Sequence, residues 1–492
     1  MKTKICGLIV GLCCLVAIFF LGEKAHAIIY LDEDQTFGIS GQIQTRATFR
    51  LEDSKGFTYP DTPAGHLVQH RNLVYFEVDH DLKKVKFPLD FKLKYHIVAR
   101  FYYDGVYDYG PDEFQKVGNQ PNPIRRIDDF KWNASVWEWY ADISRGALFF
   151  RIGRQNLSWG ETDVFRLLDN INPLDNTFGF VFEDLNDRRI PLEMIRATYN
   201  FGKVGPISSF GVDGFLVPGV FDNTISPTAP PGTPYAAPLP APPLPLVEEK
   251  LNHRWDNSRY GLRLQGVLFD YLNFSLAGYR TILDDPNLHI VLAPFPVGLE
   301  LNHSESKVWI WGGSMSFHEK HIDTIVRSEV AFLHDVPVFI PAINLTTGDI
   351  PKKDFIRFSV GLDKNLWIRP LNYKNTFLVS LQYFGQYINN YENGISAPIP
   401  RFPNPTDFVS IKKYEQTFTL LMNTTYLNGN LTPQLVVGYD PRGSLLLIPS
   451  IQYQFFDRFR ANLQYGGILG KFTGFGFFRD RDQISLTLSC LF

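Results

Sequence analysis

The sequence predicts an all-β protein that forms a transmembrane, antiparallel, up-and-down β-barrel of about 18 strands. Three observations lead to this prediction: a leader at the N-terminus, long stretches of strict polar–apolar alternation, and a chain that ends on phenylalanine. Beyond the leader, the sequence has no apolar run near the roughly 18 residues that a membrane helix needs. If the chain enters a bilayer, we therefore expect it to do so with strands.

The first 27 residues have the three zones of a signal peptide. Lys2 and Lys4 precede an apolar stretch at 5–21, and Ala25-His26-Ala27 follows as an A-x-A cleavage site. A membrane anchor is the alternative, but an anchor alone would leave the pattern of the remaining chain unexplained. We expect cleavage after Ala27, which leaves 28–492 as a single barrel domain exported to the outer membrane of a Gram-negative bacterium.

Composition excludes several classes of protein. The formal net charge is −3, so no basic excess indicates a nucleic-acid partner. Three of the four cysteines lie in the leader, and the remaining Cys490 can form neither an internal disulfide nor a multi-cysteine metal site. Aromatic residues make up 15% of the chain and gather at the ends of alternating segments, as at Tyr102 and Tyr103. This placement is typical of interfacial girdles, which predicts contact with outer-membrane lipids. No C-x-x-C-H motif for covalent haem occurs, and we expect no cofactor.

Residues 37–51 show the strand pattern most clearly. Apolar residues at Phe37, Ile39 and Ile43 alternate with polar residues at Gln42 and Gln44, a period of two that gives a strand one apolar and one polar face. Such strands match the roughly 9 to 11 tilted residues that cross a bilayer. The same pattern predicts 18 strands, near 37–51, 67–82, 91–103, 134–144, 147–157, 190–201, 207–217, 258–268, 272–282, 307–318, 322–334, 354–364, 375–388, 414–427, 431–440, 444–455, 459–469 and 482–492.

The connections between these segments alternate between short and long. Outer-membrane barrels have short periplasmic turns and long outer loops, so an even number of strands would place both termini in the periplasm. Pro433 and Pro449 fall inside predicted strands, and the link at 441–443 is short for an outer loop. Because proline cannot donate to a ladder, 16 strands is the alternative count.

The last predicted strand has a pattern that resembles a signal for barrel assembly. Leu488, Cys490 and Phe492 alternate with polar residues, and the chain stops on Phe492. This resembles the C-terminal strand that the barrel-assembly machinery recognises in outer-membrane proteins, which predicts that machinery as a partner. In hydrocarbon every unsatisfied backbone group is costly, so the first and last strands must pair. A barrel of this size encloses a lumen too wide for side chains to fill.

A longer motif runs from Arg151 to Asp175. The stretch 151–161 reads RIGRQNLSWGE and 171–175 reads INPLD, with EWY upstream at 138–140. With 327–331 and 449–453, these residues resemble the outer-membrane proteins grouped as "domain of unknown function 1302". The resemblance spans nearly the whole chain after the leader. It implies an outer-membrane barrel that works with periplasmic partners in the export or uptake of hydrophobic compounds.

The loop at 158–189 mixes many carboxylates with arginines. Our hypothesis is that it folds into the lumen and forms a constriction that selects by charge. The alternative is an ordinary solvated outer loop. The residues assigned to the constriction are Arg151, Arg154, Trp159, Glu161, Asp163 and Asp175.

Two other segments have a simpler interpretation. The predicted outer loop at 218–257 includes nine prolines between Ser226 and Pro245, a composition that favours an extended and exposed conformation. His318 and His321 could suggest a metal site, but they fall in a predicted short turn without a helix to align them. A polar turn is the better interpretation.

We expect a channel or conduit for small or hydrophobic molecules and not an enzyme, since no G-x-S-x-G elbow occurs. The second hypothesis is a barrel scaffold that docks a periplasmic partner, either a lipoprotein or an electron carrier. A lumen with a constriction favours the channel, and a wide lumen without an internal loop favours the scaffold. An outer-membrane hydrolase is the third hypothesis and would require a nucleophile next to a base.

Overall fold

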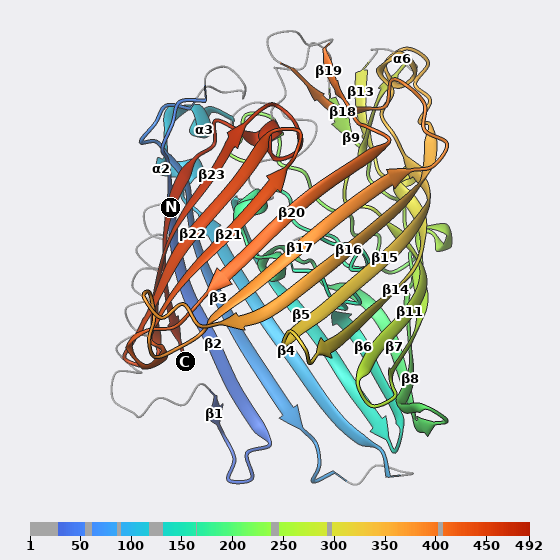
Figure 1. The fold of residues 1–492 in the computed structure, drawn as a ribbon, viewed down its shortest axis with the longest axis vertical. Coiled ribbons are helices and arrows are strands. Elements are labelled where there is room, and N and C mark those ends of the chain that lie inside the picture. The colour runs from blue at the N-terminus through green and yellow to red at the C-terminus, as the bar shows by residue number, and fades with distance from the viewer. Residues whose placement is uncertain are drawn as a thin grey trace.

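A computed structural model of the chain describes residues 28–54, 62–85, 90–117, 131–163, 165–237, 246–292, 298–401 and 407–492. The predicted signal peptide at 1–27 lies outside these ranges, as does the second half of the proline-rich segment. Eighteen antiparallel strands close into a barrel, and a short strand, β1 (Ile29–Tyr30), adds to β2 at one end (Figure 1).

All eighteen strands that the alternation predicts are present, with ends shifted by a few residues. In the first half of the chain they are β2 (Phe37–Arg50), β3 (Leu67–Asp81), β4 (Lys92–Asp104), β5 (Trp132–Arg145), β6 (Leu148–Gln155), β7 (Leu192–Val204), β8 (Ile207–Val217), β10 (Arg259–Leu268) and β11 (Leu272–Ile282). In the second half they are β14 (Lys307–Glu319), β15 (Thr324–Pro337), β16 (Lys352–Leu366), β17 (Phe377–Ile388), β20 (Tyr414–Asn423), β21 (Leu431–Asp440), β22 (Ser444–Phe455), β23 (Phe459–Gly470) and β24 (Gln483–Leu491).

The first and last barrel strands close the sheet. β2 pairs with β3 on one side and with β24 on the other, from Arg50 opposite Gln483 to Gln42 opposite Leu491. Gly41 and Phe492 continue this ladder by exchanging two backbone hydrogen bonds of 2.8 and 3.0 Å. The barrel therefore has no free edge at this seam, as a sheet in hydrocarbon requires.

The two prolines do not reduce the strand number to 16. Pro433 lies in β21 opposite Ile451, and Pro449 lies in β22 opposite Leu435. The ladder between β22 and β23 skips Ile448 and Pro449 and then resumes in the same register. A local gap in the ladder thus accommodates the missing N–H of Pro449.

The barrel wall has an apolar outer face and a polar inner face. In β2, Thr48 and Arg50 point into the barrel and are buried, whereas Phe49 points outward and is 43% exposed. Side chains of the same kind cover the outside, including Phe76, Ile97, Trp139, Ile152, Leu262, Leu276, Trp311, Val330, Leu381, Phe418, Leu463 and Leu486. An outer surface of this composition is stable in hydrocarbon and not in water. Among the described residues, no helix is long and apolar enough to cross a membrane.

The connections are short at the barrel end where β1 and Phe492 lie and mostly long at the other end. The one short link there, 441–443, is a tight turn in which Gly443 has a φ of 116° and its N–H donates to the carbonyl of Asp440. The long loops hold most of the small elements, and several of these rise beyond the barrel end (Figure 1). The small elements of the long loops are α2 (Val106–Tyr109), α3 (Asp112–Val117), η2 (Phe180–Phe182), α5 (Leu185–Arg188), β9 (Leu246–Glu248), η3 (Trp255–Asn257), β12 (Asn287–Val291), β13 (Gly298–Asn302), η4 (Ser304–Ser306), α6 (Pro341–Asn344), β18 (Ser396–Pro400), β19 (Phe408–Ser410) and η6 (Gly474–Phe478). A further turn, η5 (Leu427–Gly429), lies at the end with the short connections, between β20 and β21.

The largest apolar cluster lies inside the barrel. Residues of the β6–β7 connection, among them Trp159, Leu168 and Ile171, are almost fully buried against the inner face of the wall. Wall residues that take part include Phe215, Tyr279, Ile310 and Leu333. The burial of this apolar surface favours a fixed position of the connection inside the barrel.

Candidate functional site

The β6–β7 connection, residues 156–191, enters the barrel next to β8. Trp159 is 1% exposed and packs edge-on against Phe215 and Tyr279, with ring centres 5.1 and 5.7 Å away. Its indole N–H donates to Asp213 at 3.1 Å. Asp213 is itself held by two hydrogen bonds of 2.9 Å from Arg196. The tryptophan of the W-G-E motif is thus a wedge between the loop and the wall.

Glu329 of β15 fixes the next part of the loop. Its carboxyl group accepts the backbone N–H groups of Glu161 at 2.8 Å and Leu168 at 2.7 Å. The hydroxyl of Tyr279 donates to the carbonyl of Leu168 at 2.7 Å. Because Glu329 is 2% exposed, water cannot replace these bonds readily, and the backbone is pinned at two points.

Arg327 lies two residues before Glu329 on the same inner face. It donates to the carbonyl of Glu161 at 2.5 Å and to the carboxylate of Asp163 at 2.6 Å. Asp163 also accepts a hydrogen bond of 2.6 Å from Gln382 of β17, and Arg327 is paired with Asp363 of β16 at 2.6 Å. Arg327 of β15 and Gln382 of β17 therefore hold this aspartate of the loop, and Asp363 of β16 fixes Arg327.

The loop then reaches the opposite side of the barrel. Arg46 of β2 forms an ion pair of 2.5 Å with Glu183, and Gln464 of β23 donates to the carbonyl of Phe182 at 2.8 Å. The guanidinium of Arg71 in β3 lies 3.6 Å from the ring centre of Phe178. Contacts from β8 through β17 and from β2, β3 and β23 show that the segment spans the lumen.

Asn172 joins the two ends of this segment. Its side-chain oxygen accepts the N–H of Leu157 at 2.8 Å, and its amide group donates to the carbonyls of Gln155 and Ile190 at 3.2 and 2.9 Å. The asparagine is 0% exposed. The I-N-P motif therefore closes the base of the loop, which explains why an asparagine with both donors and an acceptor is needed there.

The proline-rich connection also folds inward. Tyr235 and Ala236 are 6% and 3% exposed, and Arg481 donates to the carbonyl of Ala236 at 2.6 Å. The hydroxyl of Ser226 donates to the carbonyl of Leu174 at 2.5 Å, which ties this connection to the β6–β7 loop. The exposure expected from the proline content was therefore wrong for residues 226–236, because tyrosine and alanine within the run pack against other loops.

A cavity of about 1090 Å³ remains between the β6–β7 loop and the wall formed by β2 and β20–β24. The loop side is charged, with Asp163, Asp169, Glu183, Arg188 and Arg189 among its residues. The wall side also carries Arg46, Arg357 and Arg460, with a few apolar residues such as Leu446 and Ile448. Most of its residues are amides and hydroxyls: Gln42, Gln44, Thr432, Gln434, Ser450, Gln452, Asn462, Gln464, Thr487 and Ser489.

Most charges on the loop side are paired. Arg166 binds Asp284, and Arg189 binds Asp169. The surface of Asp187 is open to the lumen, but protein surrounds the carboxyl group on most sides. This partial loss of bulk water, with the negative charges of Glu183 and Asp184, raises the pKa of Asp187 to about 6. The charge of the cavity lining therefore changes in a mildly acidic range.

Residues 8–492 match the family described as "Protein of unknown function (DUF1302)". The chain belongs to this family. The resemblance that the W-G-E and I-N-P motifs predicted is thus confirmed, and in this member of the family both motifs serve to hold the lumen loop. No curated protein matches the sequence.

Several solved structures of barrels are similar to this family member over nearly its whole length. Acinetobacter baumannii OccAB1 has 10% sequence identity and a TM-score of 0.49, and the match covers 96% of this chain and 99% of that chain. Acinetobacter baumannii OccAB3 has 11% identity and a TM-score of 0.48, with coverages of 93% and 99%. Pseudomonas aeruginosa OpdK, solved with vanillate, has 10% identity and a TM-score of 0.46, with coverages of 92% and 98%.

Asp163 lines the cavity, and the other five residues predicted to form the constriction have other surroundings. Glu161 accepts a hydrogen bond of 3.0 Å from Ser314 on the wall. Asp175 is buried and caps Thr177 within the loop, and Trp159 is the wedge described above.

Arg151 and Arg154 lie in β6, before the loop begins. Arg151 binds Asp142 through two hydrogen bonds of 2.7 and 2.8 Å and lies 3.9 Å from the ring centre of Tyr140. Arg154 lies 5.6 Å from the ring centre of Trp137. Neither is among the cavity residues.

The sequence did not single out Arg46, Glu183 or Asp187 as members of the constriction. Arg46 lies in the first barrel strand, so only the closed barrel brings it to Glu183. The available signal was weak: an arginine on the polar side of β2, which also carries Gln42, Gln44, Thr48 and Arg50.

Leu488, Cys490 and Phe492 lie at the closing seam. Leu488 points outward and is 43% exposed, and Cys490 pairs with Ile43 of β2. The ring of Phe492 covers Gly41, where an added Cβ would lie 2.4 Å from a ring carbon. Their predicted role in recognition by the assembly machinery stays a prediction.

The structure also locates the histidines that bear on metal and enzyme hypotheses. His318 lies near the end of β14 and binds Asp323, and His321 lies in the β14–β15 turn and binds Glu319. Among the described residues, Thr45 is the one serine or threonine hydrogen-bonded to a histidine ring, at 3.3 Å from His70. Its hydroxyl proton is directed to Asn72 at 2.9 Å, so this pair is not arranged as a nucleophile and base.

Proposed function

We propose that this protein is an outer-membrane channel for small polar solutes and that the β6–β7 loop restricts its passage. The observation that carries the proposal is the cavity of about 1090 Å³ between a charged loop and a wall of amides and hydroxyls. A constriction with fixed polar groups selects solutes by size and by hydrogen bonding. The apolar outer face supports placement in the outer membrane after export.

The lining supports polar solutes over the hydrophobic compounds implied by the family resemblance. Ten amide and hydroxyl side chains face the cavity from the wall, and ion pairs line part of the opposite side. Apolar residues such as Val181 and Ile448 form a smaller part of the lining. A hydrophobic solute would remove water from these groups without replacing its hydrogen bonds, which costs free energy. Small sugars, amino acids and other compounds with several donors and acceptors fit better.

The scaffold hypothesis receives less support. A barrel that surrounds a periplasmic partner needs an open lumen, but loop residues contact both sides of this lumen, from Asp213 to Arg46. A hydrolase receives no support from the hydroxyl and imidazole of Thr45 and His70, whose hydrogen bonds do not activate the hydroxyl.

Liposome swelling with purified protein tests the channel. We expect swelling in small sugars and amino acids, with a rate that falls as solute size increases, and slower swelling in apolar solutes of the same mass. Liposomes with heat-denatured protein are the control. Correctly folded protein that produces no swelling with any solute would contradict the proposal.

A further inference from the structure

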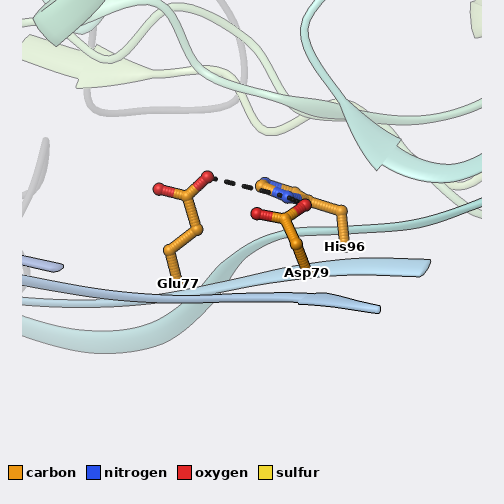
Figure 2. Close-up of side chains that lie close together, drawn as sticks. All are labelled: Glu77, Asp79 and His96. Carbon is orange, nitrogen blue, oxygen red and sulfur yellow. Dashed lines mark hydrogen bonds and ion pairs between the residues drawn. The ribbon is translucent and has the colours of Figure 1, made fainter. Parts of the chain in front are cut away.

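A histidine and two carboxylates meet on the inner face of β3 and β4, outside the loop site. Asp79 and His96 are directly opposite each other in the ladder between these strands, and Glu77 lies two residues from Asp79 on the same face. Figure 2 shows the two carboxylates and the imidazole pointing toward one another. One oxygen of each carboxylate and one ring nitrogen of His96 lie within 4.8 Å of one another.

We propose that Glu77, Asp79 and His96 form a binding site for one divalent transition-metal ion of the Zn²⁺ class, open to the lumen. His96 Nδ1 lies 2.8 Å from Asp79 Oδ1 and 3.7 Å from Glu77 Oε1. Zn²⁺ binds nitrogen and oxygen at about 2.0–2.2 Å, which sets ligand atoms roughly 3 Å or more apart. Small side-chain rotations bring the three atoms to these separations.

The charge at this position favours a cation. Among the described residues, Glu77 and Asp79 form no ion pair with a lysine or arginine, and their ionic partner is His96. Of the neighbouring acidic groups, Asp142 is paired with Arg151 and Asp81 with Lys94, whereas Glu138 accepts a hydrogen bond from Asn156. Two carboxylates without a lysine or arginine partner, together with an imidazole, match the ligand types of an open zinc site, which keeps one position for water or solute.

The surroundings hold the histidine in place. The ring of His96 stacks on Tyr140 of β5 with ring centres 4.7 Å apart and an angle of 21° between them. The side chain of His96 is 13% exposed, whereas those of Glu77 and Asp79 are 39% and 59% exposed to the lumen. Strand residues with a packed ring form a more rigid ligand set than a loop. The imidazole favours Zn²⁺, Cu²⁺ or Ni²⁺ over Mg²⁺ and Ca²⁺, which prefer oxygen ligands alone.

Cation binding is independent of transport, so this site can be tested whether or not the protein conducts. Full-length protein in detergent is treated with a chelator and titrated with ZnCl₂ by calorimetry. We expect a Zn²⁺ site whose affinity is weakened by about 100-fold or more by His96→Ala, or by the pair Glu77→Gln and Asp79→Asn. His334→Ala is the matched control and should leave the affinity of this site unchanged, because His334 belongs to the second histidine–carboxylate group, with Asp335 and Asp354.

The gel mobility of unheated and heated samples shows whether each variant is folded. Millimolar Mg²⁺ should leave the Zn²⁺ isotherm unchanged. Equal stoichiometry and affinity for Zn²⁺ in folded wild type, His96→Ala and the double variant would overturn the proposal. In that case His96 and Asp79 form only a hydrogen-bonded pair in a wet lumen.

Discussion

Glu329 accepts the backbone N–H of Glu161 at 2.8 Å, across 168 positions of sequence. Glu161 ends the W-G-E motif, and Glu329 belongs to the R-S-E segment that the sequence singled out separately. Arg327 of the same segment binds the carbonyl of Glu161. Two distant motifs therefore have one joint role, which is to fix the β6–β7 loop on the inner wall.

Glu329→Gln should loosen this loop without opening the barrel. The amide keeps one acceptor but presents an NH₂ group to the second backbone N–H, and a lost buried hydrogen bond costs about 1–3 kcal/mol. We expect faster proteolysis within 158–189 and noisier single-channel currents, with unchanged gel mobility of the unheated protein. Glu319→Gln, at the exposed end of β14, is the control. Equal proteolysis of wild type and Glu329→Gln would contradict the anchoring role.

Trp159→Phe should lower the thermal stability of the loop. The ring can still pack against Phe215 and Tyr279, but the hydrogen bond to the fully buried Asp213 is lost. We expect a loss of about 1–3 kcal/mol, measured as earlier loss of near-ultraviolet circular dichroism on heating. Trp132→Phe, in which the side chain is 50% exposed, should have little effect. Identical thermal unfolding of Trp159→Phe and Trp132→Phe would contradict a stabilising role for the hydrogen bond from Trp159 to Asp213.

Gly41→Ala should impair closure of the barrel. Its Cβ would lie 2.4 Å from the ring of Phe492 and 2.6 Å from the carbonyl oxygen of Tyr75. We expect a smaller fraction of protein with the fast gel mobility of a folded barrel after refolding in detergent. Gly211→Ala is a matched control in β8, since the nearest atom to its added Cβ is 3.5 Å away. Equal folded fractions of the two variants would contradict the close packing at the seam.

The ion selectivity of the passage should depend on pH through Asp187. Its pKa is raised to about 6, so the carboxyl is ionised above this pH and neutral below it. Cation preference, measured as reversal potential in a salt gradient, should therefore fall as the pH decreases from 7 to 5. Asp187→Asn should show the low-pH selectivity at both values, whereas Asp169→Asn, which breaks the pair with Arg189, should keep the pH dependence. A pH dependence unchanged in Asp187→Asn would exclude this residue as its source.

The strands could be predicted from the sequence because each has a strict period of two on an apolar outer face. Errors occur where a segment ends without a change in pattern. β20 ends at Asn423 and not at 427, because Thr424 and Thr425 hydrogen-bond to Asn372 in the neighbouring turn. That contact joins residues 52 positions apart, which local alternation does not reveal.

The interior of the barrel was harder to predict. Arg46 and Glu183 meet only when a strand and a loop from different parts of the chain share one lumen. The burial of Tyr235 likewise depends on neighbouring loops and contradicts the composition of its own segment. The motif residues were recognisable, but the sequence analysis assigned Trp159 to the constriction, whereas Trp159 and Asn172 hold the loop in position.

Single-channel conductance in planar bilayers tests the central claim most directly. Wild type is compared with a variant in which residues 161–188 are replaced by a short glycine–serine linker, after gel mobility has shown that both are folded. The account predicts a small, charge-selective conductance for wild type and a much larger, weakly selective conductance for the variant. Equal conductance and selectivity in the two folded proteins, or no conductance in either, would contradict a passage restricted by this loop.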